Sequence, residues 1–173
     1  MRILAVLVLA IAATSQAAPD GLSVLANLDA PVADRRTAAQ ALAASADVAR
    51  RDELAWYYLI TDDAPLRRTL VDMLIADGAM TAAQAAQVPT TARVARELRR
   101  LVRHPVVPID ARRCGVRVAD ASLHVRCRAL RCERGCRDHR LEVELAIGRR
   151  WTLVSSKEST SDDGACGYCM FVE

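Results

Sequence analysis

All six cysteines of this 173-residue chain lie in its last third. They are Cys114, Cys127, Cys132, Cys136, Cys166 and Cys169. Such a concentration is typical of a small domain that buries too little apolar surface to be stable alone and is held together by disulfides. The cysteines therefore predict two parts: a first part without disulfides and a last part that depends on them.

The first residues have the pattern of a secretory signal peptide. Arg2 precedes an apolar run over residues 3–13, and Ser15 and Ala17 place small residues at the −3 and −1 positions of a cleavage site. The run is too short to span a bilayer as a helix. We expect a signal peptide over residues 1–17, with an uncleaved anchor as the alternative. The mature protein would then be periplasmic or secreted, without stable membrane insertion, where disulfides form.

Residues 20–104 have the composition of a helical region. Between Leu22 and Arg103, Ala, Leu, Arg, Asp and Gln dominate, and clusters of β-branched or aromatic residues are almost absent. These residue types favour helix. Helix boundaries are expected at residues suited to start, cap or end a helix: Pro65, Gly78, Thr81, and Thr90 or Thr91.

Two stretches of this region match at a spacing of 32 residues. Arg35–Leu42 and Arg67–Leu74 each begin Arg-Arg-Thr and continue with an Ala/Leu stripe. A leucine and an Asp-containing turn that ends in proline precede each copy, and Arg99-Arg100 falls one period further on. The pattern resembles the HEAT-type helical repeat over residues 22–104. The resemblance implies stacked antiparallel helix pairs with a binding surface along one side.

The last stretch of the helical region is amphipathic and basic. Arg93, Arg96, Arg100 and Arg103 line one face, and Val94, Leu98, Leu101 and Val102 line the other. A basic face of this kind can bind an acidic surface, or it can be the solvated side of a packed helix. The segment His104–Pro108 contains two prolines, which end the helix and mark the boundary to the next part.

Beyond this boundary the apolar period changes from helical to two. Folding the chain at Asp120-Ala121 as a hairpin pairs Val118 with Leu123, Val116 with Val125 and Cys114 with Cys127. The two cysteines then point to the same core-facing side, within bridging distance. We therefore predict a Cys114–Cys127 disulfide. The side chains of Arg113, Arg117, His124 and Arg128 should lie on the opposite face, with His124 and His139 exposed to solvent.

The remaining pattern predicts a five-stranded antiparallel β domain over residues 109–173. A half-buried strand alternates from Leu141 to Ile147, residues 148–150 turn, and Trp151–Val154 returns. Residues 156–164 contain no apolar side chain and are expected to form a polar loop, followed by a last strand over 168–172. The fold class is thus α+β, with a helical region followed by a small disulfide-stapled β domain.

The other four cysteines leave three interpretations open. Cys166 and Cys169 form a C-x-x-C, the spacing of thiol–disulfide oxidoreductases, although four residues after it are too few for the usual helix. Together with Cys132 and Cys136 they could instead bind zinc, with His124 or His139 as further ligands. We favour structural disulfides, which an oxidising compartment promotes, with the 132–136 segment joined crosswise to the C-terminal pair.

No catalytic motif or cofactor-binding motif is recognisable, so the sequence favours a protein that is not an enzyme and needs no cofactor. The formal charge of +3 is too small to indicate nucleic acid. Residues 112–140, however, hold nine Arg against three acidic residues, an excess suited to a protein partner or an acidic envelope ligand. We expect an exported, non-catalytic binding or structural protein, with an oxidoreductase centred on Cys166 and Cys169 as the alternative.

Overall fold

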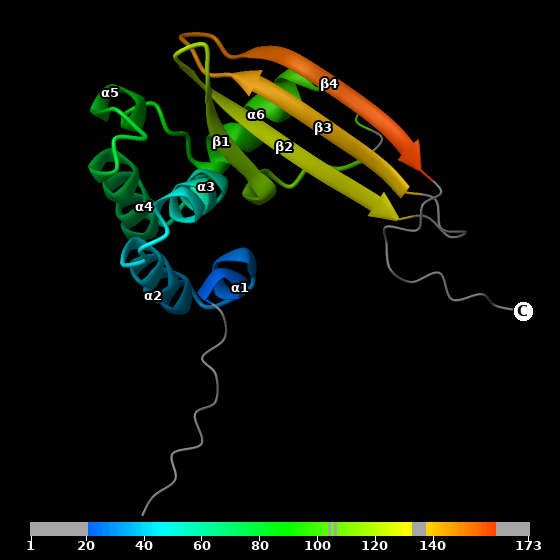
Figure 1. The fold of residues 1–173 in the computed structure, drawn as a ribbon. Coiled ribbons are helices and arrows are strands. Elements are labelled where there is room, and N and C mark those ends of the chain that lie inside the picture. The colour runs from blue at the N-terminus through cyan, green and yellow to red at the C-terminus, as the bar shows by residue number, and fades with distance from the viewer. Residues whose placement is uncertain (1–20, 104, 106, 133–137, 162–173) are drawn as a thin grey trace, which may run out of the picture.

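The structure, a computed structural model, describes residues 21–103, 105, 107–132 and 138–161. Helices come first and an antiparallel sheet follows, which confirms the α+β class (Figure 1). The helices are α1 (Gly21–Ala26), α2 (Val32–Ala43), α3 (Val48–Tyr58), α4 (Ala64–Ala76), α5 (Ala82–Ala85) and α6 (Thr91–Leu101). A 3₁₀ turn, η1 (Ala111–Arg113), leads into β1 (Cys114–Ala119), β2 (Ser122–Cys132), β3 (Asp138–Ala146) and β4 (Thr152–Ser161).

The predicted helix boundaries are confirmed by their capping contacts. Pro65 lies in the first turn of α4, and Gly78 follows its end with φ at +71°, a conformation that favours glycine. Thr81 forms a capping box with Gln84, and the Thr90 side chain accepts a hydrogen bond from the backbone of Arg93. These local signals determine where the helices begin and end.

The first four helices follow the 32-residue period. The α1 and α2 ranges, moved by 32 residues, fall on α3 and α4. Equivalent hydroxyls make equivalent bonds: Thr37 donates to the carbonyl of Ala33 at 3.1 Å, and Thr69 donates to that of Pro65 at 3.2 Å. The likeness to HEAT repeats itself stays a prediction.

Arg51 fixes the position of α3 relative to its neighbours. Its guanidinium pairs with Asp77 at the end of α4 and donates to the carbonyls of Ala43 and Ser45 at 3.2 and 3.0 Å. The Arg51 and Asp77 side chains are both largely buried, so the pair resists screening by solvent. This matters because α3 lies beside the first strand of the sheet.

The sheet is a simple antiparallel meander in the order β1-β2-β3-β4. The predicted hairpin register is confirmed at every pair from Cys114–Cys127 to Ala119–Ser122. The turn residues Asp120 and Ala121 both have positive φ, as a two-residue hairpin turn requires. The predicted Cys114–Cys127 disulfide is present, with Cα atoms 4.2 Å apart.

One face of the sheet, here called the inner face, belongs to the core. Its buried side chains are Cys114, Val116, Leu123, Val125, Cys127, Leu141, Val143 and Leu145. Helix α6 crosses behind this face (Figure 1) and contributes Val94 and Leu98 to the same core. Arg93 lies over the Trp151 ring at 5.6 Å, and Arg100 donates to the Trp151 carbonyl at 2.9 Å. Part of the basic side of α6 is therefore used in packing.

The predicted polar loop over residues 156–164 is wrong for its first part. Strand β4 continues to Ser161 and pairs with β3 as far as Asp138. The loop was expected because β4 has no alternating apolar side chains. As an edge strand with most side chains exposed, it is held by backbone pairing and needs no such pattern. The predicted strand over 168–172 lies outside the described residues.

Candidate functional site

The outer face of the sheet is as polar as the inner face is apolar. Its charged side chains form rows across the strands, because directly paired residues share a face. One row contains Arg128, Glu142 and Lys157, and the next contains Gly115, Arg126, Glu144 and Ser155. Helix α3 lies near this face only at the β1 end of the sheet (Figure 1).

Gly115 is the point where α3 comes closest to the sheet. A Cβ atom at this position would lie 3.2 Å from the Cα of Tyr57 and 3.4 Å from its carbonyl oxygen. A side chain there would push the backbone of α3 away by a few tenths of an ångström, because the obstructing atoms are backbone. The close approach places the aromatic residues Trp56 and Tyr57 of α3 beside the outer-face arginines.

A groove of 530 Å³ lies between α3 and the first two strands, and we name it the β1 groove. Its lining consists of Glu53, Trp56, Tyr57, Ala79, Arg113, Gly115–Val118, Arg126 and Arg128. Two of its side chains are unusually exposed for their types: Tyr57 at 50% and Val118 at 42%. Four guanidinium groups, two aromatic rings and one carboxylate therefore meet in a cavity large enough for a small ligand or a few peptide residues.

The four arginines differ in how far they are neutralised. Arg126 and Arg128 share Glu142, at 3.5 and 2.9 Å, and all three side chains are well exposed. Arg117 pairs with Glu144. Arg113 has no hydrogen bond or ion pair with any side chain in the described part of the chain, although its charge helps lower the pKa of Asp110, after the hydrogen bond from Arg112. The groove is therefore incompletely compensated, chiefly at Arg113.

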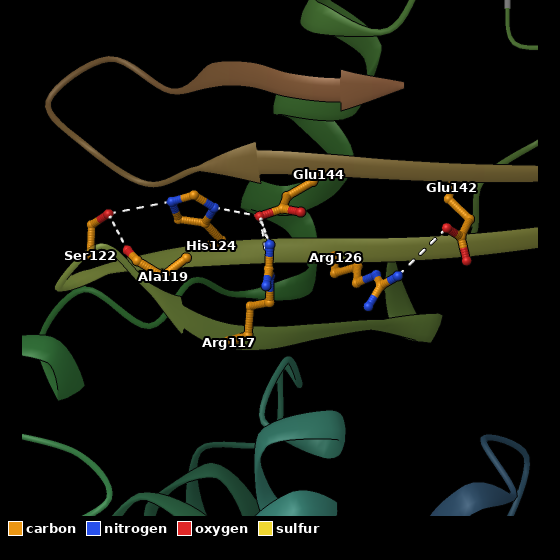
Figure 2. A network of polar contacts seen from close by, with 7 residues as sticks. All are labelled: Arg117, Ala119, Ser122, His124, Arg126, Glu142 and Glu144. Atoms are coloured by element: carbon orange, nitrogen blue, oxygen red, sulfur yellow. Dashed lines mark hydrogen bonds and ion pairs between the residues drawn. The ribbon is translucent and has the colours of Figure 1, made fainter. Parts of the chain in front are cut away.

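Glu144 lies at the centre of a small polar network next to the groove (Figure 2). Its Oε1 atom accepts hydrogen bonds from Arg117, at 2.5 Å from Nη2 and 3.1 Å from Nε, and lies 2.5 Å from His124 Nδ1. Burial alone would raise the pKa of the Glu144 carboxyl. The hydrogen bonds and positive charges of His124 and Arg117 outweigh burial and lower that pKa. Glu144 thus holds Arg117 at the rim of the groove.

His124 is buried, with 7% of its surface exposed, so the expectation that it faces solvent is wrong. It does lie on the predicted outer face, where the side chains of Glu144 and Ser122 contact its two ring nitrogens (Figure 2). Strand parity gives only the face on which His124 lies, whereas its burial depends on the pairing with β3, which brings Glu144 beside it. His139 is half-buried.

Ser122, His124 and Glu144 have the distances of a nucleophile, base and acid. The Ser122 hydroxyl oxygen lies 3.3 Å from His124 Nε2, and the opposite ring nitrogen contacts Glu144 (Figure 2). The Ser122 hydroxyl also lies 3.0 Å from the Ala119 carbonyl, which can accept its single proton in place of the histidine. These contacts join the turn end of the β1–β2 hairpin to β3. Sequence reasoning missed this network.

The remaining cysteines cannot be compared with their predicted pairings. Cys136, Cys166 and Cys169 lie outside the described residues, and Cys132 is described only in its backbone, at the end of β2. Within the described ranges there is no group of three or more His, Cys, Asp or Glu residues suited to a metal ion. Both the crosswise disulfides and the redox role of the C-x-x-C remain predictions.

Comparisons with known proteins add no family or fold assignment. No protein-family model, no curated protein and no solved structure matches the chain. In the part of the chain that the structure describes, no helix is both long enough and apolar enough to cross a membrane. The Cys114–Cys127 disulfide fits an oxidising environment.

Proposed function

We propose that this protein is an exported, non-catalytic binding protein of the periplasm or extracellular space, and that the β1 groove takes an acidic ligand. The observation that carries the proposal is that the Arg113 guanidinium has no hydrogen bond or ion pair with a side chain in the described part of the chain, in a groove shared with three further arginines. Export is supported by the leader pattern of residues 1–17 and by the Cys114–Cys127 disulfide.

The composition of the groove supports binding rather than a merely solvated surface. Arginine, tyrosine and tryptophan are the residue types enriched where proteins bind partners. Here they converge from four elements, with Trp56 and Tyr57 from α3 and the four arginines from η1, β1 and β2. A solvated sheet face needs arginines, but it does not need exposed aromatic and aliphatic side chains beside them.

A non-catalytic role is supported by the lack of any recognisable catalytic motif in the sequence. Glu144 shares its oxygen between His124 and Arg117 and so holds Arg117 at the rim of the groove. The oxidoreductase alternative depends on Cys166 and Cys169, and nothing in the described part of the chain favours it over the binding role.

The test is a calorimetric titration of the full mature chain with hexaglutamate and, separately, with polyphosphate. We expect saturable binding that weakens as salt is added, because the attraction is between exposed charges. Arg113→Glu should weaken binding of either probe about tenfold, which corresponds to a loss of roughly 1.4 kcal/mol of binding free energy. Arg149→Glu makes the same charge change outside the groove and should have less than a twofold effect. Absence of saturable binding by both probes would contradict the proposed function.

A further inference from the structure

Strand β1 forms one edge of the sheet and has backbone groups that β2 does not use. In a hairpin with a two-residue turn, the pair next to the turn is hydrogen-bonded, and hydrogen-bonded pairs then alternate with pairs that are not. Counting from Ala119–Ser122, the pairs of Val116 and Val118 are of the second type. The Cα separation of 4.2 Å at Cys114–Cys127 agrees, because it is the short spacing of such pairs. Val116 and Val118 therefore direct their N–H and C=O groups away from β2.

These backbone groups open into the β1 groove. Val116 and Val118 both line it, together with Trp56 and Tyr57. Within the described residues, no backbone hydrogen bond joins either valine to an element other than its own sheet. An unpaired strand edge is a template on which an extended chain can add as a further strand.

The two edges of the sheet differ in how well they discourage such pairing. Strand β4 carries Lys157 and Glu158 among a series of exposed polar side chains. Charged residues, lysine above all, are a common protection of an edge strand. Strand β1 carries one exposed charge, that of Arg117, which is paired with Glu144. Its open end carries Val118, which is 42% exposed, and its groove is walled by α3. The structure thus leaves β1 as the edge available for a ligand.

A strand added to β1 would meet different surroundings on its two sides. Its outer-face side chains would lie near Arg113 and Arg117, on either side of the point where the α3 backbone packs on Gly115. Side chains two residues apart lie about 6.8 Å apart and share a face. Its inner-face side chains would continue the apolar row of Val116 and Val118. The fitting segment therefore alternates acidic and apolar residues.

We propose that the β1 groove binds an extended acidic segment of a partner polypeptide, which pairs with the free edge of β1 through the backbone of Val116 and Val118. The proposal rests on the proposed function, because it takes the anion-binding groove as its site. It adds the class of ligand, a peptide with alternating acidic and apolar side chains, and the mode of recognition, strand addition.

The probe is a capped pentapeptide of alternating glutamate and valine, titrated into the full mature chain by calorimetry. Its matched control is the same peptide with its valine nitrogens methylated, which keeps every charge and side chain but removes backbone donors. We expect the control to bind about tenfold more weakly, the fold-change of losing one to two net hydrogen bonds. Hexaglutamate, which lacks the apolar positions, should also bind more weakly than the alternating peptide.

The variant Val118→Pro removes the backbone donor that faces the groove. Proline is tolerated on an edge strand where its nitrogen faces away from the sheet, so the fold should be kept, and circular dichroism checks this. Val118→Ala keeps the donor and trims the same side chain. The proline variant should bind the unmethylated peptide several-fold more weakly than the alanine variant does, because it has lost one backbone donor to the peptide. Equal binding of this peptide by the two variants would contradict pairing at residue 118.

The outcomes separate this proposal from the proposed function. Equal binding of the two peptides by the native chain overturns strand addition while leaving the anion-binding groove standing. Polyphosphate that displaces the alternating peptide at equal charge concentration also overturns the peptide as ligand. A concentration-dependent dimer that Val118→Pro dissociates would assign the edge to a second copy and overturn the proposal. Failure of every acidic probe to bind contradicts both the anion-binding groove and strand addition. If Val118→Pro does not fold, the comparison of the methylated and unmethylated peptides on the native chain still tests strand addition.

Discussion

The two faces of the sheet are built from the same strands but differ in burial and in the kind of side chain they carry. Inner-face residues such as Val125 and Leu145 are fully buried and contact the core that α6 shares. Outer-face residues such as Arg126 and Arg128 are exposed and have a single shared carboxylate, that of Glu142. The inner face therefore determines stability, and the outer face is free to determine binding.

The largest effect on stability is expected from Leu145→Ala on the inner face. Leu145 is fully buried in β3, and truncation leaves a cavity that the sheet cannot close. We expect unfolding free energy to fall by about 3–4 kcal/mol, as measured by urea denaturation. Binding of acidic probes by the folded fraction should be unchanged. A loss below 1 kcal/mol would show that the inner face is not a packed core.

The Cys114–Cys127 disulfide should contribute slightly less. The two cysteines are 13 residues apart, and closing such a loop restricts the unfolded chain by about 3 kcal/mol. The double variant Cys114→Ala/Cys127→Ala should lose about that much unfolding free energy in the same denaturation experiment. A double variant as stable as the native chain would contradict the contribution assigned to the bridge.

A smaller and pH-dependent effect is expected from Glu144→Gln. Because the folded state lowers the pKa of Glu144, its stabilisation is complete above the unfolded pKa of about 4.3 and is lost as pH falls through the folded value. At pH 7 the variant should be about 1–2 kcal/mol less stable. Its stability should then fall less steeply than the native chain's between about pH 5 and pH 3. If the unfolding free energies of the variant and the native chain changed in parallel with pH, the stabilising role of the Glu144 carboxylate would be contradicted.

The smallest effect on stability is expected from Arg126→Ala. Its ion pair with Glu142 is long and exposed, and such pairs contribute little. Unfolding free energy should change by less than about 0.5 kcal/mol, while affinity for hexaglutamate should fall several-fold. A variant that loses stability but binds normally would reverse the roles assigned to the two faces.

The contrast between the faces also explains what could be predicted from the sequence. The hairpin register and the Cys114–Cys127 bridge were predictable because an alternating pattern has only one register that buries all its apolar residues. Strand β4 was not, because an exposed edge strand is held by backbone pairing alone. Helix boundaries were predictable wherever a capping residue marks them, as at Thr81 and Thr90.

The candidate site was only partly predictable. An excess of arginine over residues 112–140 is visible in the sequence, and it includes all four arginines of the groove. The other wall of the groove comes from α3, nearly sixty residues earlier, and no local pattern connects Tyr57 with Gly115. The burial of His124 likewise depends on the register between β2 and β3, which brings Glu144 beside it.

The two tryptophans give the most direct test of the account. Trp56 lines the β1 groove, whereas Trp151 lies in the core beneath α6. In a nitrogen-15 NMR titration with the alternating acidic peptide, we expect the indole signal of Trp56 to move with saturation and that of Trp151 to stay in place. Movement of the Trp151 signal with a stationary Trp56 signal would contradict the assignment of binding to the outer face.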